Sequence, residues 1–131
     1  MIVDSSAIVA ILFNEPAAKH CIEALLSSPE NRISAASFLE AGIVVDRLPP
    51  PREAMTLEEL IGELHISIEP VTAHQARIAL EAHRRYGKGT GHPARLNFGD
   101  CFAYALAIAF DEPLLFIGQD FVHTDVRRVL S

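Results

Sequence analysis

The stretch that decides the fold is Asn97-Phe98-Gly99-Asp100-Cys101-Phe102-Ala103-Tyr104-Ala105-Leu106-Ala107-Ile108-Ala109-Phe110. Its last ten residues are all apolar and include good helix formers, so they predict a helix buried on nearly every side. A helix without a polar face must be covered by other parts of the chain. Its one charged feature, Asp100, could cap the helix, because an Asp side chain accepts hydrogen bonds from free backbone N–H groups.

Outward from this helix, short apolar segments alternate with helical patterns. Strands are expected at residues 1–3, 32–34, 66–71 and 114–117, with a further edge strand over 126–130. Helices are expected over about 7–13, 16–27, 35–47, 56–65 and 73–85, where Ser34, Thr56 and Thr72 are suitable caps. This alternation predicts one α/β domain over residues 1–131, a three-layer α/β/α arrangement with a central parallel sheet.

Composition narrows the classes of protein. Seventeen acidic residues against 11 Lys and Arg give a net charge of −6, which argues against a protein that coats nucleic acid without specificity. The longest apolar run has ten residues, far fewer than the roughly 20 that cross a bilayer, so we expect no membrane segment. No basic region precedes the apolar start, and Cys21 and Cys101 have the surroundings of reduced core thiols. We therefore expect a cytoplasmic protein.

Four acidic residues are predicted to meet at one edge of this sheet. Asp4 ends the first strand, and Glu40 lies in the helix after the second. Asp100 begins the helix that leads into the strand at 114–117, and Asp120 follows that strand. Ligands of parallel sheets bind at the carboxyl ends of the strands, which is the edge that these acids share.

Each of these acids also has an ordinary structural explanation. Asp4 could cap the helix that begins at Ser5, and Asp120 could be a simple turn residue. Glu40 could pair with Ser37 in a capping box, although Ser34 is the better placed cap. These alternatives stay open from the sequence alone.

If the acids converge, they require a cation. Two carboxylates ~4 Å apart repel by about 4 kcal/mol at an effective dielectric constant near 20. An all-oxygen cluster without His or Cys suits Mg²⁺ or Mn²⁺ rather than zinc. Such an ion activates a water molecule and neutralises charge on a leaving oxygen, which is the chemistry of phosphodiester hydrolysis.

Four segments together resemble a known family. They are Met1-Ile2-Val3-Asp4-Ser5-Ser6-Ala7, Ser34-Ala35-Ala36-Ser37-Phe38-Leu39-Glu40, Leu96-Asn97-Phe98-Gly99-Asp100-Cys101-Phe102-Ala103-Tyr104 and Leu114-Leu115-Phe116-Ile117-Gly118-Gln119-Asp120-Phe121. In this order along the chain they resemble the PIN domain, and more narrowly the VapC toxins of type II toxin–antitoxin pairs. The resemblance implies a single PIN domain over residues 1–131 that acts as a Mg²⁺- or Mn²⁺-dependent endoribonuclease.

The resemblance also implies roles for particular residues. Asp4, Glu40 and Asp100 match the family's acidic triad, with Asp4 and Asp100 as the metal ligands. Asp120 matches a fourth acid, but Gly118 stands where many PIN domains have another aspartate, which puts a second metal site in doubt. Ser6 matches a hydroxyl residue that supports the first aspartate, and Asn97 matches a polar residue before the Gly-Asp pair. The family further implies a homodimer and a cognate antitoxin protein as partners.

A basic segment is the candidate RNA contact. No acid occurs between Ala82 and Gly99, whereas four bases do: Arg84, Arg85, Lys88 and Arg95. Such a cluster in an acidic protein suits an RNA backbone, although a solvated helix end with a loop would look the same.

Two other functions remain possible from the sequence. The absence of an acid at Gly118 favours a PIN-like module that binds a partner without catalysis. A phosphatase or receiver-type domain would use Asp4 as a phosphoacceptor, but it would need a second acid where Ser5 and Ser6 stand.

Overall fold

The computed structural model describes residues 1–130, so that Ser131, the last residue of the predicted domain, lies outside the described residues. The elements in chain order are β1 (Ile2–Val3), α1 (Ser5–Leu12), α2 (Ala18–Ser27), β2 (Asn31–Ser34), α3 (Ala35–Arg47), α4 (Leu57–Glu63), β3 (Ile66–Glu69), α5 (Ala73–Tyr86), α6 (Phe98–Phe110) and β4 (Leu114–Leu115). The predicted alternation of strands and helices is confirmed.

The strands form one parallel sheet with the order β3-β2-β1-β4. The first and last strands in the sequence, β1 and β4, are therefore neighbours in the sheet, with Ile2 opposite Leu114 and Val3 opposite Leu115. The edge strand expected over 126–130 is reduced to a single bridge between Leu114 and Arg128. This segment is bonded to β4 by two backbone hydrogen bonds. The Arg127 carbonyl accepts from the Leu114 N–H at 2.8 Å, and the Val129 N–H donates to the Leu114 carbonyl at 3.1 Å.

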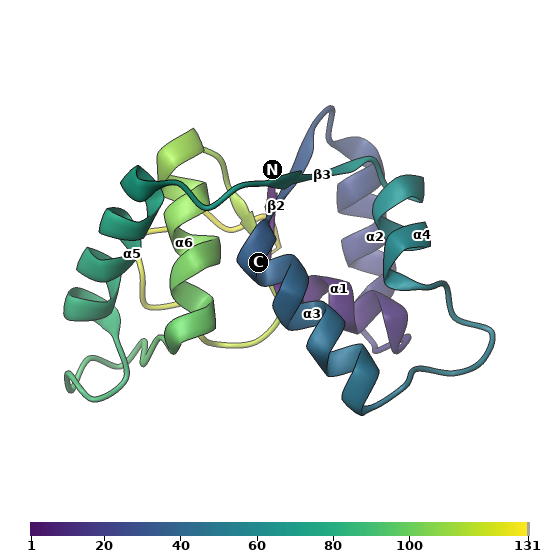
Figure 1. The fold of residues 1–131 in the computed structure, drawn as a ribbon, viewed down its shortest axis with the longest axis horizontal. Helices are drawn as coiled ribbons and strands as arrows, with labels where there is room; N and C mark the ends of the chain where they lie inside the picture. Colours follow the sequence, from purple (N-terminus) through teal and green to yellow (C-terminus); the bar gives the residue numbers. More distant parts are fainter. Residues whose placement is uncertain (131) are drawn as a thin grey trace.

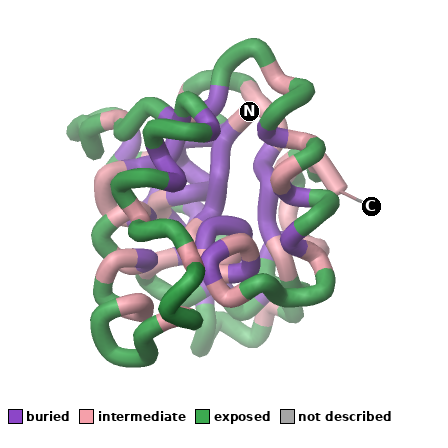
Figure 2. The backbone as a smooth tube through the Cα atoms, turned by 90° about the vertical axis from the view of Figure 1, so that its right-hand side faces the viewer, coloured by how far each residue is buried: buried purple, intermediate pink, exposed green. Residues whose placement is uncertain are grey.

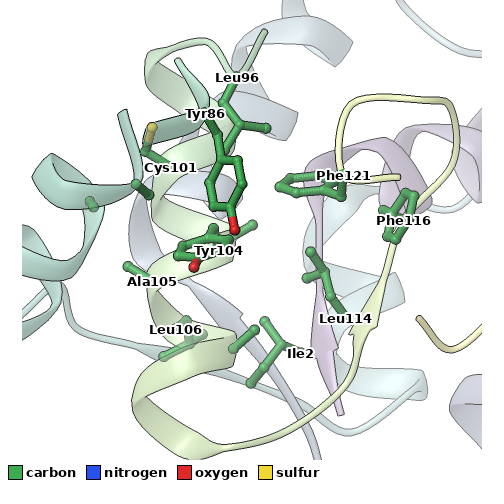
Figure 3. Close-up of a cluster of buried hydrophobic side chains, with 14 of the residues drawn as sticks. Ile2, Tyr86, Leu96, Cys101, Tyr104, Ala105, Leu106, Leu114, Phe116 and Phe121 are labelled. Carbon is green, nitrogen blue, oxygen red and sulfur yellow. The ribbon is translucent and has the colours of Figure 1, made fainter. Parts of the chain in front are cut away.

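Helices cover both faces of the sheet (Figure 1). Helices α5 and α6 pack on one face, against Ile2, Leu114 and the aromatic residues that follow β4 (Figure 3). Helices α1, α2, α3 and α4 enclose the other apolar cluster, which includes Val3 and Leu115. Successive side chains of a strand point to opposite faces, so both short strands contribute to both cores. The three-layer α/β/α prediction is confirmed.

Helix α6 is buried from its first turn to its middle and exposed at its C-terminal end. Asp100, Cys101 and residues 103–107 are buried, whereas Ile108 and Phe110 are 40% and 38% exposed. The prediction that residues 101–110 are covered on nearly every side is wrong for Ile108 and Phe110. A helix of 13 residues is about 20 Å long, while β1 and β4 have two residues each, so the core beneath the helix is shorter than the helix.

The predicted helix starts at Ser34, Thr56 and Thr72 are confirmed. The Ser34 hydroxyl accepts from Ala36 N–H, and those of Thr56 and Thr72 accept from the N–H three residues on. Cys21 and Cys101 are buried free thiols, as expected. Among residues 1–130, the helices are too short or too polar to cross a membrane.

The topology brings distant segments to the carboxyl edge of the sheet. β1 ends directly before Asp4, β2 leads without a loop into α3, and β4 leads into the turn at 116–120. Figure 2 shows the buried residues gathered toward the centre of the molecule, with exposed residues around them. The residues at this edge therefore follow strands β1, β2 and β4, which are largely buried.

Candidate active site

Asp4 lies directly after β1 and is only 4% exposed. It caps α1: its Oδ2 accepts hydrogen bonds from the backbone N–H of Ser6 at 3.0 Å and from the Ser6 hydroxyl at 2.5 Å. The other oxygen, Oδ1, is buried and has no hydrogen-bond partner among the described residues. The cap and a second role therefore use different oxygens of one carboxylate, so that the capping explanation does not compete with a ligand role.

The Ser6 hydroxyl ties Asp4 to the end of the sheet. Its Oγ donates to Asp4 and accepts from the backbone N–H of Ile117 at 3.0 Å. Ile117 belongs to the segment after β4, so this one side chain joins the ends of two adjacent strands.

Asp100 does not cap α6 in the manner of an N-cap. The N-cap is Asn97, and Asp100 is the third residue of the helix, where the two side chains form a reciprocal capping box. Asn97 Oδ1 accepts from the Asp100 N–H at 2.9 Å, while Asp100 Oδ2 accepts from the Asn97 N–H at 3.0 Å. The N-cap reading of Asp100 is wrong because the helix begins at Phe98, three residues before the apolar run.

Glu40 lies in the second turn of α3, and its carboxylate reaches two neighbouring helices. Its Oε1 accepts a hydrogen bond from the Ser5 hydroxyl at 2.6 Å. Its Oε2 lies against Gly99, in the first turn of α6. The proposed capping box between Ser37 and Glu40 is wrong, because the helix is capped by Ser34 and the Ser37 hydroxyl is buried without a partner in the described part of the chain.

Asp120 lies in the exposed turn after β4. It lines an open cavity of about 370 Å³. The other residues of this cavity are Lys88, Pro93, Ala94, Arg95, Asn97, Gln119 and His123. The cavity therefore places basic side chains beside the outermost of the four acids.

The four acids influence one another. The pKa of Asp4 is raised to about 6, chiefly because the carboxyl is buried. Hydrogen bonds from Ser6 lower this pKa, whereas the negative charges of Glu40 and Asp120 raise it. Burial likewise raises the pKa of Asp100 to about 7, with added repulsion from Asp120, Asp4 and Glu40. A nearby positive charge would lower these two pKa values, so their elevation indicates that the acids have no cationic partner close by.

The donor set fits a hard divalent cation. The candidate ligands are all oxygens, and Asp4 offers a buried oxygen without a partner. Within residues 1–130, no three His, Cys, Asp or Glu side chains are gathered tightly enough to hold a metal ion as they stand. Mg²⁺ usually takes one or two carboxylates and keeps several waters, so a site for it does not need three close protein ligands. Asp4 and Asp100 are the two buried members and remain the predicted ligands.

The predicted basic segment divides into two parts. Lys88 and Arg95 line the cavity beside Asp120. Arg84 instead pairs with Glu81 at 2.8 Å on the surface of α5, and the guanidinium of Arg85 lies over the ring of Tyr86, 4.7 Å from its centroid. Only the loop part of the segment therefore shares a cavity with a candidate catalytic residue.

Sequence reasoning missed four residues at this edge: Ser5, Gly99, Gln119 and His123. A signal existed for Gly99, since a glycine among good helix formers weakens a helix and so marks a close approach. Gln119 and His123 carried no signal, because their place depends on how the turn after β4 folds back toward the loop at 88–95.

Comparisons with known proteins agree with this architecture. Residues 1–127 match the PIN domain family. VapC ribonuclease Mb0625 of Mycobacterium bovis and ribonuclease VapC28 of Mycobacterium tuberculosis are each 53% identical over all of this chain and 98% of their own length. A VapC ribonuclease of Mycolicibacterium smegmatis is 43% identical over 98% of this chain and 99% of its own.

Solved structures show the same fold. The crystal structure of M. tuberculosis VapC20, described as a toxin that cleaves the sarcin–ricin loop, matches with a TM-score of 0.75 and 19% identity over 98% of this chain and 97% of its own. A toxin–antitoxin complex from Klebsiella pneumoniae matches with a TM-score of 0.69 and 17% identity, over 95% and 92% of the two chains. With its whole length matched in sequence and fold, this chain belongs to the PIN domain family, among the VapC ribonucleases.

Proposed function

We propose that this protein is the toxin of a type II toxin–antitoxin pair and an endoribonuclease that depends on Mg²⁺ or Mn²⁺. The observation that carries the proposal is the unpartnered buried oxygen of Asp4 beside three further acids at the carboxyl edge of the sheet. The bound cation would activate water and neutralise developing charge on the leaving oxygen of an RNA phosphodiester. The names of the relatives, which are ribonucleases, support the same reaction class.

The residues have distinct roles in this proposal. Asp4 and Asp100 hold the cation, and each is oriented by a hydrogen bond that leaves one carboxylate oxygen for it. Glu40 completes the site, in part through water, and Asp120 acts from an outer position. Ser6 and Asn97 orient the two ligands, so the supporting roles are carried by residues two or three positions from each acid in the chain.

The RNA backbone would lie over the open cavity beside Asp120. Lys88 and Arg95 line this cavity, and their positive charges would contact phosphates there. Arg84 and Arg85 lie at the end of α5 and would contact the backbone further away.

The decisive experiment is the substitution Asp100→Asn. The amide retains an oxygen that can accept the Asn97 N–H bond, so the capping box and the fold should persist while the charge is lost. We expect the folded variant to bind Mn²⁺ weakly and to leave RNA uncut. Cleavage at the wild-type rate by the folded variant would show that the site is elsewhere.

A second candidate function is a PIN-like module that binds a partner without catalysis. It is favoured by Gly118, which takes a φ of +105° that side chains rarely adopt, so the turn is built for glycine rather than for a further acid. Calorimetry with Mn²⁺ separates the two functions. A catalytic domain should show saturable uptake that Asp4→Asn abolishes, whereas a module for binding alone should show none.

The partners in this proposal are those of the VapC family. We propose a homodimer in the cytoplasm that is held inactive by a cognate antitoxin protein. Co-expression with the product of an adjacent short reading frame, followed by purification of the complex and light scattering, tests both associations. Sequencing the RNA ends produced on brief expression of the toxin alone would identify the substrate.

A further inference from the structure

The Glu40 carboxylate is held between two helices other than its own. On one side the Ser5 hydroxyl of α1 donates to Oε1 at 2.6 Å. On the other side Oε2 faces the backbone of α6 at Gly99. Glu40 is on α3, so three helices that are far apart in the sequence meet at one carboxylate.

Gly99 leaves the space that this carboxylate occupies. A Cβ atom built on Gly99 would overlap Oε2 of Glu40 and would lie 2.9 Å from its Cδ and 3.1 Å from its Oε1. No other side chain or distant backbone atom is among its three nearest neighbours. A methyl group at this position would therefore collide first with the end of the Glu40 side chain.

The backbone does not require glycine at this position. Among the described residues, the glycines with positive φ are Gly89, Gly91 and Gly118, and Gly99 is not one of them. Gly99 lies in the first turn of α6, and alanine is a better helix former than glycine, by up to roughly 1 kcal/mol in a helix interior. The backbone conformation at position 99 and the helix propensity of alanine thus both permit alanine there. The Glu40 carboxylate occupies the space that its methyl group would need.

We infer that Gly99 is a positioning residue that, together with Ser5, fixes the carboxylate of Glu40 at the mouth of the proposed metal site; this inference rests on the proposed ribonuclease function. Ser5 restrains one oxygen by a hydrogen bond, and Gly99 admits the other against the first turn of α6. A longer side chain at position 99 turns Glu40 away without disturbing the fold. Its effect is on the site rather than on stability.

The test is Gly99→Ala, with Gly62→Ala as its control. Gly62 also lies in a helix, and a Cβ built there meets no atom within 4 Å. Both variants should melt at or above the wild-type temperature, because alanine favours the helix. Only Gly99→Ala should weaken Mn²⁺ binding in calorimetry and lower kcat by about tenfold or more, since catalytic groups tolerate little displacement. KM should stay near the wild-type value, because Lys88 and Arg95 are unchanged.

Two further variants show whether Gly99 acts through Glu40. The double variant Gly99→Ala/Glu40→Ala should cleave RNA and bind Mn²⁺ no worse than Glu40→Ala alone, because the collision is gone. An additional loss in the double variant would overturn the inference, and so would wild-type cleavage and Mn²⁺ affinity in Gly99→Ala. If Gly99→Ala fails to fold, the double variant must fold as well as Glu40→Ala for the inference to stand. Full activity of Glu40→Ala would instead refute the role of Glu40 in the proposed function itself.

Discussion

The Ser6 hydroxyl donates a hydrogen bond to Oδ2 of Asp4 at 2.5 Å, and the Oγ of Ser6 accepts one from the backbone N–H of Ile117 at 3.0 Å. One hydroxyl therefore orients the most buried acid of the site and also joins the ends of β1 and β4. Asp4 is left with its other oxygen free for a cation.

This relationship predicts the effect of Ser6→Ala. The hydrogen bond from Ser6 lowers the pKa of Asp4, so its loss should move that pKa further above its ordinary range. Mn²⁺ binding and RNA cleavage should then require a higher pH, with their acidic limbs shifted upward by about half a unit to one unit. The unpaired N–H of Ile117 should also cost on the order of 1–2 kcal/mol in the free energy of unfolding.

The control for this prediction is Ser27→Ala, since the exposed Ser27 hydroxyl bonds to the carbonyl of Glu23 within its own helix, α2. Calorimetric titrations with Mn²⁺ from about pH 5 to pH 8 measure the shift. Identical pH profiles for Ser6→Ala and the wild type would show that the hydroxyl does not tune Asp4.

The raised pKa values of Asp4 and Asp100 predict that the metal-free protein loses stability as the pH rises. Each carboxyl binds its proton more tightly in the folded state than at the ordinary value of 3.8, so folding takes up protons. The resulting stabilisation is fully present below about pH 4 and is lost as the pH rises through about 6 for Asp4 and about 7 for Asp100.

Thermal unfolding in a chelator should reveal this loss between pH 5 and 8. Asp4→Asn cannot ionise, so at the alkaline end it should be more stable than the wild type by on the order of 2 kcal/mol. Saturating Mn²⁺ should reverse the pH dependence for the wild type only, because metal binds the ionised carboxylates. A wild-type melting temperature that stays constant or rises with pH in the chelator would contradict the prediction.

The sequence was sufficient to predict the sheet. Short apolar segments imply buried parallel strands, and the carboxyl ends of such strands share an edge. Topology placed Asp4, Glu40 and Asp100 near that edge, and the resemblance to the PIN domain singled them out as a triad. In the structure the charge of Glu40 raises the pKa of Asp4, and the charges of Asp4 and Glu40 raise the pKa of Asp100, which supports their proximity, while their role as one site stays a prediction.

What the sequence could not provide was the contact between side chains on different helices. The bond from Ser5 to Glu40 depends on the angle between α1 and α3, and the space at Gly99 depends on how closely α6 approaches. Likewise, Lys88 and Arg95 could be separated from Arg84 only when the path of the loop was known. Local patterns predict elements, whereas these distances arise from packing between them.

The cavity beside Asp120 predicts that Lys88→Ala and Arg95→Ala weaken RNA binding more than Arg84→Ala does. Lys88 and Arg95 line the cavity, whereas Arg84 already pairs with Glu81 on the surface of α5. Each cavity variant should raise KM severalfold and reduce the dependence of log affinity on log salt by about one unit, because one phosphate contact is lost.

Fluorescence anisotropy with a labelled single-stranded RNA, in a chelator to prevent cleavage, measures these slopes across roughly 50 to 200 mM salt. Arg84→Ala is the matched control, since it removes the same charge from the same protein. An equal loss in all three variants would show that Arg84 contributes as much as the two cavity residues, and the cavity would then have no special role.

The capping box predicts that Asn97→Ala harms the site beyond its cost to stability. Asn97 Oδ1 caps the N–H of Asp100, and the backbone of Asn97 in turn orients the Asp100 carboxylate. Loss of a helix cap costs about 1 kcal/mol in the free energy of unfolding.

The control is Thr72→Ala, which removes the cap of α5 in the same way. The Thr72 hydroxyl accepts from the Gln75 N–H at 3.1 Å, but α5 carries none of the four acids. Chemical denaturation should find similar losses of stability in the two variants, while Mn²⁺ calorimetry should find a weakened site only in Asn97→Ala. If the two variants lose Mn²⁺ affinity to the same extent, general loosening of the fold explains the effect, and Asn97 is a cap and nothing more.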